Sequence, residues 1–242
     1  MLRVIDRPSP NHGPRPDGVP VDMLVLHYTG MRSGPEAIER LCDPAAQVSS
    51  HYVVEEDGTI FLLVPEDRRA WHAGVSCWRD QRDVNSRSIG IEIVNPGHEF
   101  GYRPFPEAQM AAVVGLCRGI LARHPIPPGN VVGHSDVAPA RKDDPGELFD
   151  WPRLAAAGIG LWPPHGTAWD GTAWDMAGLQ RDLARLGYDV PQTGGLDEPT
   201  RLVVRAFQRH WRPADFSGTP DDETVARLRA LLKLHSLHSA RP

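Results

Sequence analysis

The sequence predicts an α/β protein with a mixed central sheet flanked by helices, followed by a small three-helix C-terminal domain. Three observations support this prediction: β-prone runs alternate with helical patterns, one pair of runs carries a hairpin signal, and three short amphipathic patterns end the chain. The 242 residues, 40% hydrophobic, suffice for one good-sized core and a smaller second one. We expect a first domain at 1–157 with its core at 20–157, a linker at 158–175 and a helical domain at 176–242.

Four segments of the first domain read as strands. Residues 22–28, DMLVLHY, are apolar and β-prone and predict a buried strand. Residues 51–64, HYVVEEDGTIFLLV, predict a hairpin, because two β-rich runs flank an Asp-Gly pair. Residues 88–94, SIGIEIV, alternate as a strand does, and the valines at 131–132 predict a short strand that delivers His134.

Two segments of the first domain read as helices. Ser33 is a plausible N-cap, with Glu36 three residues further on, for a short helix to about Cys42. Residues 107–124, EAQMAAVVGLCRGILARH, carry apolar residues at helical spacing, and the prolines from Pro125 onward end this helix. Helices and strands therefore alternate along the domain.

The sequence changes character at 158–175, GIGLWPPHGTAWDGTAWD, which holds a tandem GTAWD pair and little periodicity. We interpret this stretch as a linker. Beyond it, three helical patterns with capping signals predict a small helical domain. Its expected core residues are Leu179, Leu183, Val203, Phe207, Val225 and Leu228.

Composition excludes several classes of protein. Lys and Arg total 26 against 31 Asp and Glu, a formal charge of -5, so no basic excess indicates a nucleic-acid partner. No apolar run is long enough for a membrane span, and the first residues lack the features of a secretory signal. The three cysteines, Cys42, Cys77 and Cys117, form no disulfide or zinc-cluster pattern. We therefore expect a cytoplasmic protein, and a monomer.

Histidines and an aspartate near strand ends suggest a hydrolytic zinc site, which commonly has three protein ligands and a position open for water. The candidates are His27 at the end of the first strand, His134 after the short strand, and Asp143 or Asp144. His51 and His72 fit structural or substrate-contact roles equally well. Spacing alone does not choose among the four histidines.

The motifs taken together resemble the zinc-dependent N-acetylmuramoyl-L-alanine amidases of the type-2 amidase family, in the branch of the AmpD and AmiD enzymes. This family is also related to the peptidoglycan recognition proteins. The resemblance rests on LVLHYTG (24–30), SSHYVVEEDGTIFLLV (49–64), AWHAGVSCW (70–78), NSRSIGIEIVN (85–95) and GHSDVAPARKDDPG (133–146). These motifs cover most of residues 20–157 in the family's order.

The resemblance implies roles for five residues. His27, His134 and Asp144 would bind one Zn²⁺ per chain, and Asp144 is preferred to its neighbour because the family's aspartate directly precedes Pro-Gly. Glu92 falls on the family's acidic catalytic residue and Lys142 on its lysine. None of the five is substituted, which argues against a recognition protein that has lost its metal.

The implied reaction is hydrolysis of the amide bond between N-acetylmuramic acid and L-alanine in muropeptides, during cell-wall recycling or turnover. Glu92 would move the proton from the water to the leaving amine, and Lys142 would stabilise the oxyanion. The substrate-side candidates are His51, Trp71, His72, Trp78 and Asn85. The alternatives are a non-catalytic muropeptide-binding sensor and a zinc hydrolase of another amide bond.

Two features lie outside this core assignment. The C-terminal patterns LQRDLARLGY, GLDEPTRLVVRAFQRHW and GTPDDETVARLRALL resemble the peptidoglycan-binding module of cell-wall hydrolases, with a purely packing domain as the alternative. A wall-binding module makes the periplasm the alternative location. In the loop at 133–146, Asp136, Arg141 and Asp143 are interpreted as ordinary loop charges.

Overall fold

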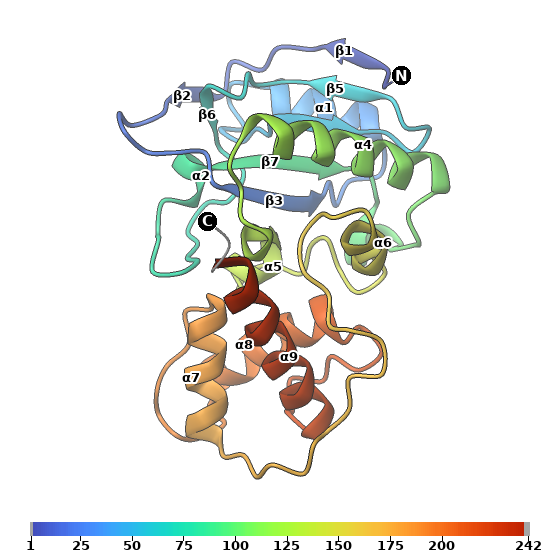
Figure 1. The fold of residues 1–242 in the computed structure, drawn as a ribbon. Coiled ribbons are helices and arrows are strands. Elements are labelled where there is room, and N and C mark those ends of the chain that lie inside the picture. The colour runs from blue at the N-terminus through green and yellow to red at the C-terminus, as the bar shows by residue number, and fades with distance from the viewer. Residues whose placement is uncertain (1, 240–242) are drawn as a thin grey trace.

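A six-stranded sheet is the centre of the computed structural model, which describes residues 2–239 (Figure 1). Its strand order is β1-β5-β4-β7-β3-β8, and every neighbouring pair is parallel except β4 with β5. The strands are β1 (Val4–Asp6), β3 (Met23–Tyr28), β4 (Tyr52–Val54), β5 (Ile60–Leu62), β7 (Ser88–Ile93) and β8 (Val131–Gly133). The predicted mixed sheet is confirmed, and the antiparallel pair is the predicted hairpin.

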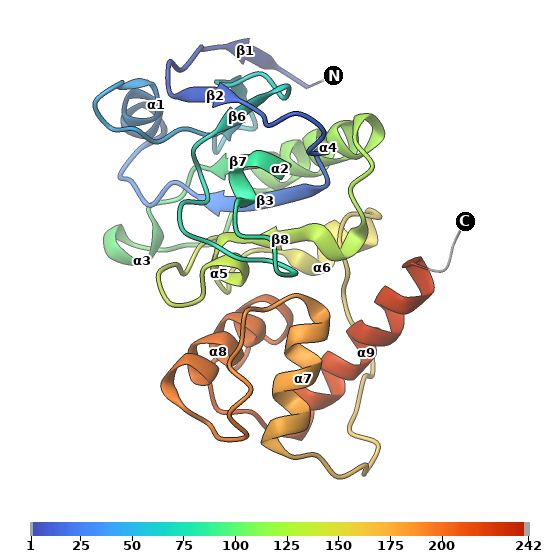
Figure 2. The ribbon, with the colours of Figure 1, turned by 90° about the vertical axis from the view of Figure 1, so that its left-hand side faces the viewer.

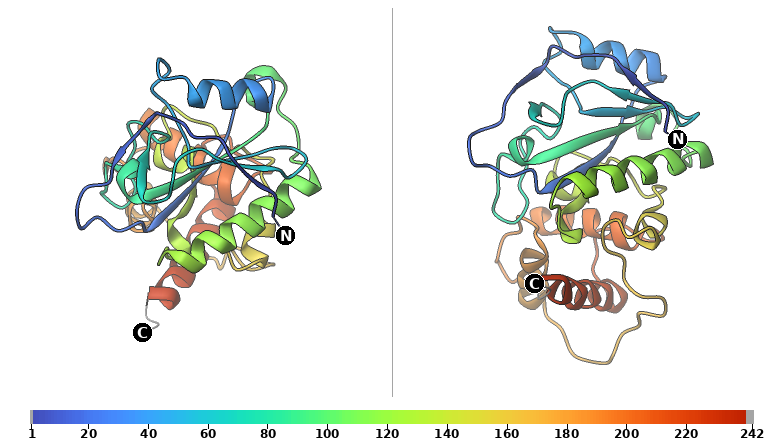
Figure 3. Two further views of the ribbon diagram at one scale, coloured as in Figure 1. Left: turned by 90° about the horizontal axis from the view of Figure 1, so that it is seen from above. Right: turned by 45° about the horizontal axis from the view of Figure 1, so that its top comes forward.

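Helices cover both faces of this sheet, with α1 and α4 on opposite sides (Figures 2 and 3). The longer ones here are α1 (Gly34–Cys42), where the Ser33 side chain accepts the Glu36 amide as predicted, and α4 (Glu107–Arg123). Four short helices and a 3₁₀ turn complete this part: α2 (Val84–Arg87), α3 (Gly97–Phe100), η1 (Pro128–Asn130), α5 (His134–Val137) and α6 (Trp151–Ala156).

Successive side chains of β3 point to opposite faces of the sheet. Leu24 and Leu26 pack in the buried cluster under α4. Met23 and Val25 point to the opposite face, as successive residues of a strand must. His27 has the same parity as Met23 and Val25, so its ring lies on the face away from α4.

Three helices form a C-terminal unit that packs below the sheet (Figure 1). They are α7 (Met176–Leu186), α8 (Glu198–Trp211) and α9 (Asp222–Ser239), and all six predicted core residues are buried. Their cluster of buried side chains also contains Met23, Val25 and Val132 of the sheet. The helices therefore complete the core on this face of the sheet.

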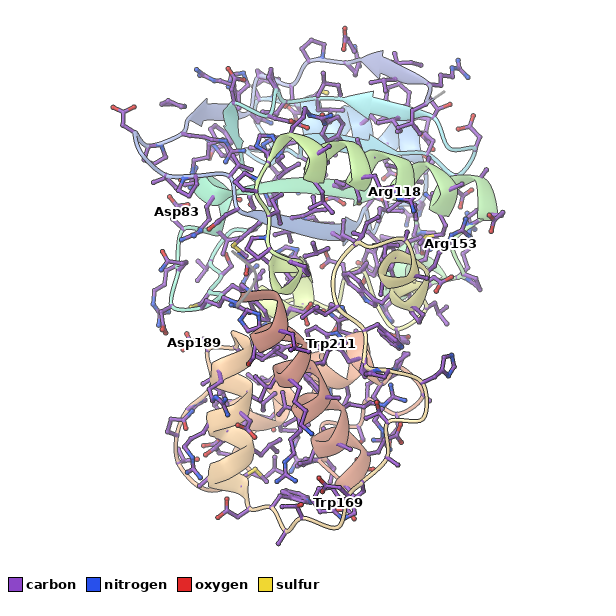
Figure 4. All side chains as sticks on the ribbon, in the orientation of Figure 1. Asp83, Arg118, Arg153, Trp169, Asp189 and Trp211 are labelled. Carbon is purple, nitrogen blue, oxygen red and sulfur yellow. The ribbon has the colours of Figure 1, made fainter. Side chains whose placement is uncertain are left out.

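The segment at 158–175 contains no helix or strand and runs along the outside of the C-terminal unit. Figure 4 shows Trp169 at the end of the unit farthest from the sheet, where the guanidinium of Arg229 lies 5.2 Å from the centre of its ring. Trp174 donates from Nε1 to Asp222 at the start of α9. The tandem tryptophans thus hold the segment against α9.

The sequence did not predict three very short strands or the four short helices. The missed strands are β1, β2 (His12–Pro14) and β6 (Arg68–Ala70), of which β2 and β6 form a separate antiparallel pair. Strands of three residues carry too little alternation to be recognised, and their partners lie far away in sequence. Within residues 2–239, no helix is long and apolar enough to cross a membrane.

Candidate metal centre and active site

Neighbouring parallel strands bring the main site residues to one end of the sheet. In the register of β3 and β7, His27 pairs with Glu92, so both side chains project from the same face. On the other side of β3, Leu26 pairs with Gly133, and His134 follows as the first residue of α5. The carboxyl ends of the three strands therefore present His27, Glu92 and His134 side by side.

Asp144 completes a compact group with the two histidines. Nδ1 of His27 lies 2.9 Å from Nδ1 of His134, and each of these atoms lies 3.0 Å from Oδ2 of Asp144. All three residues are buried. Two imidazole nitrogens and one carboxylate oxygen are the ligand types of hydrolytic zinc sites. Their atoms converge closely enough for one ion to contact all three.

The hydrogen bonds behind His27 fix the tautomer that a metal ligand needs. Ser88 donates its hydroxyl proton to the carbonyl of Val84 at 2.6 Å, so its Oγ accepts from Nε2 of His72 at 3.0 Å. Nδ1 of His72 is then an acceptor for Nε2–H of His27, 3.0 Å away. This leaves the lone pair of His27 on Nδ1, pointing toward His134 and Asp144.

A hydrogen bond also fixes the tautomer of His134. Its Nε2 lies 3.1 Å from the carbonyl oxygen of Ala73, which can only accept, so Nε2 carries the proton and Nδ1 the lone pair. The backbone amide of Ser135 donates to the carbonyl of Asp144 at 2.9 Å and ties the two ligand-bearing segments together. Both imidazoles therefore present unprotonated Nδ1 atoms to the same point.

The electrostatics also favour the protonation states of metal ligands at His27 and Asp144. Burial, reinforced by the neighbouring His134, lowers the pKa of His27 to about 4. Burial alone would raise the pKa of Asp144, but His134 and His27 outweigh it and hold the pKa of this carboxyl well below its ordinary value. Neutral histidine and ionised aspartate are the states that bind a divalent cation.

Glu92 is a partly buried carboxyl group beside the triad. Burial and the charge of Asp144 raise its pKa well above the ordinary value, although Lys142 acts in the opposite direction. Its Oε2 is buried and has no hydrogen-bond partner among residues 2–239. A carboxyl group with a raised pKa and a free oxygen is suited to accept a proton and to release it.

A cleft of about 650 Å³ opens over these groups. Glu92, His134, Lys142 and Asp144 line it, and Trp71 forms part of its wall. The rest of the wall carries both charges and rings, and includes Glu36, Arg40, His98, Glu99, Phe100 and Arg141. The predicted metal and catalytic residues are thus brought together.

The predicted substrate contacts divide into two groups. Trp71 and His72 line the cleft, although both ring nitrogens of His72 are occupied by His27 and Ser88. The predicted substrate contact at Trp78 is corrected. This residue is 1% exposed, and its ring packs edge-on against Tyr188 of the C-terminal unit. The large apolar ring is buried because the C-terminal unit covers it.

The predicted substrate contacts at Asn85 and His51 are also corrected. Both side chains are buried and form hydrogen bonds with backbone groups. The Asn85 side chain accepts the backbone amides of His72 and Ala73. His51 is fully buried, accepts the Gly90 amide on Nδ1 and contacts the Arg68 carbonyl through Nε2. Neither residue lines the cleft.

Gly90 explains how His72 reaches its position. A Cβ atom at Gly90 would lie 2.5 Å from the ring of His72, so only glycine lets the ring pack on this part of β7. The glycine in SIGIEIV is therefore a packing requirement of the site. Sequence reasoning missed it because the ring comes from a different segment.

The predicted loop charges have structural partners. The interpretation of Asp136 as an ordinary loop charge is corrected, because this residue is 1% exposed and its side chain accepts hydrogen bonds from Tyr188 and His210. Arg141, which lines the cleft, donates to the carbonyls of Ala73 and Val75. No sequence signal separated Asp136 from an exposed loop aspartate, since its partners come from the C-terminal unit.

The comparison with known families decides the assignment: residues 17–147 match the family described as N-acetylmuramoyl-L-alanine amidase. The chain belongs to the N-acetylmuramoyl-L-alanine amidase family. Membership of this family confirms that the chain is an amidase, as the sequence predicts. Residues 175–228 match a second family, described as a peptidoglycan binding domain.

Individual amidases of this family are similar over most of the chain. N-acetylmuramoyl-L-alanine amidase AmiD of Escherichia coli K12 is 42% identical over 238 residues, which is 88% of this chain and 83% of AmiD. The 1,6-anhydro-N-acetylmuramyl-L-alanine amidase AmpD of the same organism is 37% identical over 164 residues, 61% of this chain and 87% of AmpD. The similarity to AmpD thus spans a smaller part of the chain.

Solved amidase structures confirm the fold. The complex of Escherichia coli AmiD with anhydro-N-acetylmuramic acid-L-Ala-D-gamma-Glu-L-Lys superposes with a TM-score of 0.81 at 40% identity, covering 94% of this chain and 93% of AmiD. AmpDh3 of Pseudomonas aeruginosa gives the same TM-score at 36% identity, covering 95% of this chain and 96% of AmpDh3. Both matches include the C-terminal helices.

Proposed function

We propose that the chain is a zinc-dependent amidase that hydrolyses the bond between N-acetylmuramic acid and L-alanine in muropeptides. The observation that carries this proposal is the convergence of His27, His134 and Asp144 at a cleft that His134, Asp144 and Glu92 line. The fixed tautomers of the two histidines support a metal at this point. Family membership supports the identity of the bond.

In this proposal His27, His134 and Asp144 hold the zinc, which when bound supplies a Lewis acid and lowers the pKa of water. Glu92 takes the proton of the attacking water on its free oxygen and delivers it to the departing amide nitrogen. An amide needs this step because its nitrogen is a poor leaving group until it is protonated. Burial and the charge of Asp144 raise the pKa of Glu92 well above its ordinary value, which favours its return of the proton to the nitrogen.

Lys142 supplies the remaining charge. It lines the cleft beside Asp144, and its cation acts on both His27 and Glu92. As the carbonyl carbon becomes tetrahedral, negative charge develops on the substrate oxygen, and a fixed cation stabilises it. The charge of Lys142 also opposes the rise in the pKa of Glu92.

The cleft suits a charged glycopeptide. Muropeptides carry carboxylates, amides and sugar hydroxyls, and the walls offer Arg40 and Lys142 to carboxylates and Trp71 and Phe100 to sugar or peptide faces. AmiD and AmpDh3 have been crystallised with an anhydro-muramyl tripeptide and an anhydromuramic pentapeptide, respectively. We propose that this chain accepts ligands of the same class.

For the domains, we propose a catalytic unit at 1–157, a linker at 158–175 and a peptidoglycan-binding-like unit at 176–242. The two family matches, at 17–147 and 175–228, support this division. The core that the helices share with the sheet supports a fixed orientation between the two units.

We further propose a monomer in the cytoplasm. One chain supplies the complete group of site residues, and all three cysteines are free thiols, as expected in a reducing compartment. Sedimentation of the purified protein and fractionation of cells test the two statements. A stable dimer, or protein found only in the periplasm, contradicts them.

One assay tests the reaction. Purified protein is incubated with defined muropeptides, with and without a chelator, and the products are identified by mass. We expect free stem peptide with an N-terminal alanine, lost on chelation and restored by zinc. Unchanged substrate despite bound zinc contradicts the proposal and favours a binding protein, whereas cleavage inside the stem favours a hydrolase of another amide bond.

A further inference from the structure

The C-terminal unit reaches into the segment that carries His134. Asp136, two residues after this ligand, is 1% exposed, and its carboxylate accepts three hydrogen bonds. One comes from the Gly133 amide at 2.7 Å. The other two come from the C-terminal unit, from the hydroxyl of Tyr188 at 2.5 Å and from Nδ1 of His210 at 2.7 Å. Figure 2 shows α8 directly beneath α5.

His210 is itself held rigidly. Its ring stacks on Trp211 with centroids 3.6 Å apart and on Trp151 of α6 with centroids 3.7 Å apart. Figure 4 shows Trp211 where the C-terminal unit meets the sheet unit. An imidazole stacked between two indole rings cannot turn, so the direction of its hydrogen bond to Asp136 is fixed.

Arg209, the preceding residue of α8, contacts the segment that carries Asp144. Its Nη1 lies 2.8 Å from Oδ1 of Asp143, and its Nε lies 3.4 Å from Oε2 of Glu147. These two acids stand on either side of the ligand in sequence. The arginine side chain is 8% exposed, whereas Asp143 is 55% and Glu147 17% exposed, so water screens the contact with Glu147 less than the contact with Asp143.

We propose that the C-terminal unit positions two of the three metal ligands, with Arg209 and His210 of α8 and Tyr188 of the segment after α7 as the positioning residues. His27 lies within the central strand of the sheet and needs no such support. His134 and Asp144 lie beyond the strand ends, outside the hydrogen-bond ladder of the sheet. The contacts of α8 fall beside each of them and reduce the number of arrangements that the free protein samples, which raises its affinity for the ion.

This inference rests on the proposed metal site and assigns to the C-terminal unit a task other than wall binding. It also accounts for the burial of Asp136, because a carboxylate removed from water must be fully hydrogen-bonded. Removing the two donors of the C-terminal unit leaves Asp136 poorly paired, and α5 then shifts to expose it. Such a shift moves His134 without altering any ligand.

The test uses the full chain and three conservative variants. His210→Phe keeps the stacking between the tryptophans but removes the hydrogen bond, Tyr188→Phe removes only a hydroxyl, and Arg209→Met removes the charge. The matched control is Arg79→Gln, which loses a different contact between the two units, from Nη1 of Arg79 to Nε2 of His235 at 2.7 Å.

Two measurements are made on each protein. Zinc affinity is determined by competition with a chromophoric chelator, and amide hydrogen exchange of the metal-free protein is followed at Ser135, with Leu24 in the central strand as the reporter of global opening. We expect zinc binding about 10-fold or more weaker in the three variants and within about threefold of the unmodified protein in the control. Exchange should accelerate at Ser135 and not at Leu24.

Unchanged zinc affinity in the three variants, or an equal loss in Arg79→Gln, overturns the inference. So does exchange that accelerates equally at both amides, because the variants then only lower global stability. If the unmodified protein binds no zinc, the proposed function fails, and the exchange at Ser135 still decides whether α8 holds this segment. Three separate substitutions keep the test decisive when one variant does not fold.

Discussion

The Nε2 atom of His27 lies 3.0 Å from the Nδ1 atom of His72, and this hydrogen bond sets which nitrogen of His27 faces Asp144. The chain of hydrogen bonds that fixes these tautomers begins at Ser88, whose hydroxyl donates its proton to the backbone carbonyl of Val84. His72 is therefore a residue that orients a ligand, although it also lines the cleft.

Replacing His72 by alanine should weaken zinc binding about 10- to 100-fold, the usual effect of removing the partner of a ligating histidine. His72→Asn should recover most of the affinity, because its amide oxygen can accept the Nε2–H of His27. Zinc competition titrations of both variants check this. Equal zinc affinities in the unmodified protein and both variants would contradict the role of His72 in orienting His27.

Glu92→Gln should lower the turnover number about 10²–10⁴-fold, because the amide neither accepts nor donates the transferred proton in the way that a carboxyl group does. Zinc content should remain at the level of the unmodified protein, since Glu92 is not one of the three ligands. Turnover and bound metal are measured on the same preparation. A variant that keeps more than about a tenth of the activity would show that another group moves the proton.

Lys142→Met should lower the turnover number about 10²-fold and change KM less, because a charge that stabilises the oxyanion acts mainly in the transition state. The control is Lys233→Met, at the only other lysine of the sequence, which is exposed on α9. Steady-state kinetics separate the two parameters. Equal activities of the two variants would contradict a role for Lys142.

The stability of the protein should depend on pH through Glu66. Burial raises the pKa of this carboxyl, but hydrogen bonds from Arg123, His124 and Tyr52 outweigh it and hold the pKa at about 2, against 4.5 ordinarily. A lowered pKa in the folded state stabilises the protein above about pH 4.5, and this contribution is lost as the pH falls toward about 2.

Glu66→Gln should therefore lower the free energy of unfolding by about 1–3 kcal/mol at pH 7, and the difference should shrink below about pH 4.5. Urea unfolding at pH 7, 5 and 3.5 measures it. As a control, Glu107→Gln removes the exposed ion pair with Arg153 and should leave stability nearly unchanged. A difference between Glu66→Gln and the unmodified protein that is constant with pH would contradict the account.

The sequence was sufficient to predict the elements with strong local patterns. The apolar run at β3, the Asp-Gly hairpin of β4 and β5, and the periodicity of α4 each depend on neighbouring residues, and all three are present. The metal candidates His27, His134 and Asp144 could be selected only through the family resemblance, because spacing left several histidines and two aspartates open.

The remaining features depend on contacts between distant segments. Trp78 resembles a sugar-stacking residue in sequence, but Tyr188, more than a hundred residues later, packs on it. Asp136 resembles a loop charge until His210 is seen to bond with it. The task of His72 follows from a hydroxyl proton on Ser88, which no sequence pattern reveals.

Stoichiometric reconstitution tests the central claim most directly. Metal-free protein is titrated with zinc, and release of stem peptide with an N-terminal alanine from a defined muropeptide is measured after each addition. Because residues 2–239 offer one such group, His27, His134 and Asp144, activity should rise linearly and stop rising at one zinc per chain. Activity that is independent of zinc, or that remains when His134→Ala and Asp144→Ala are combined, would contradict the account.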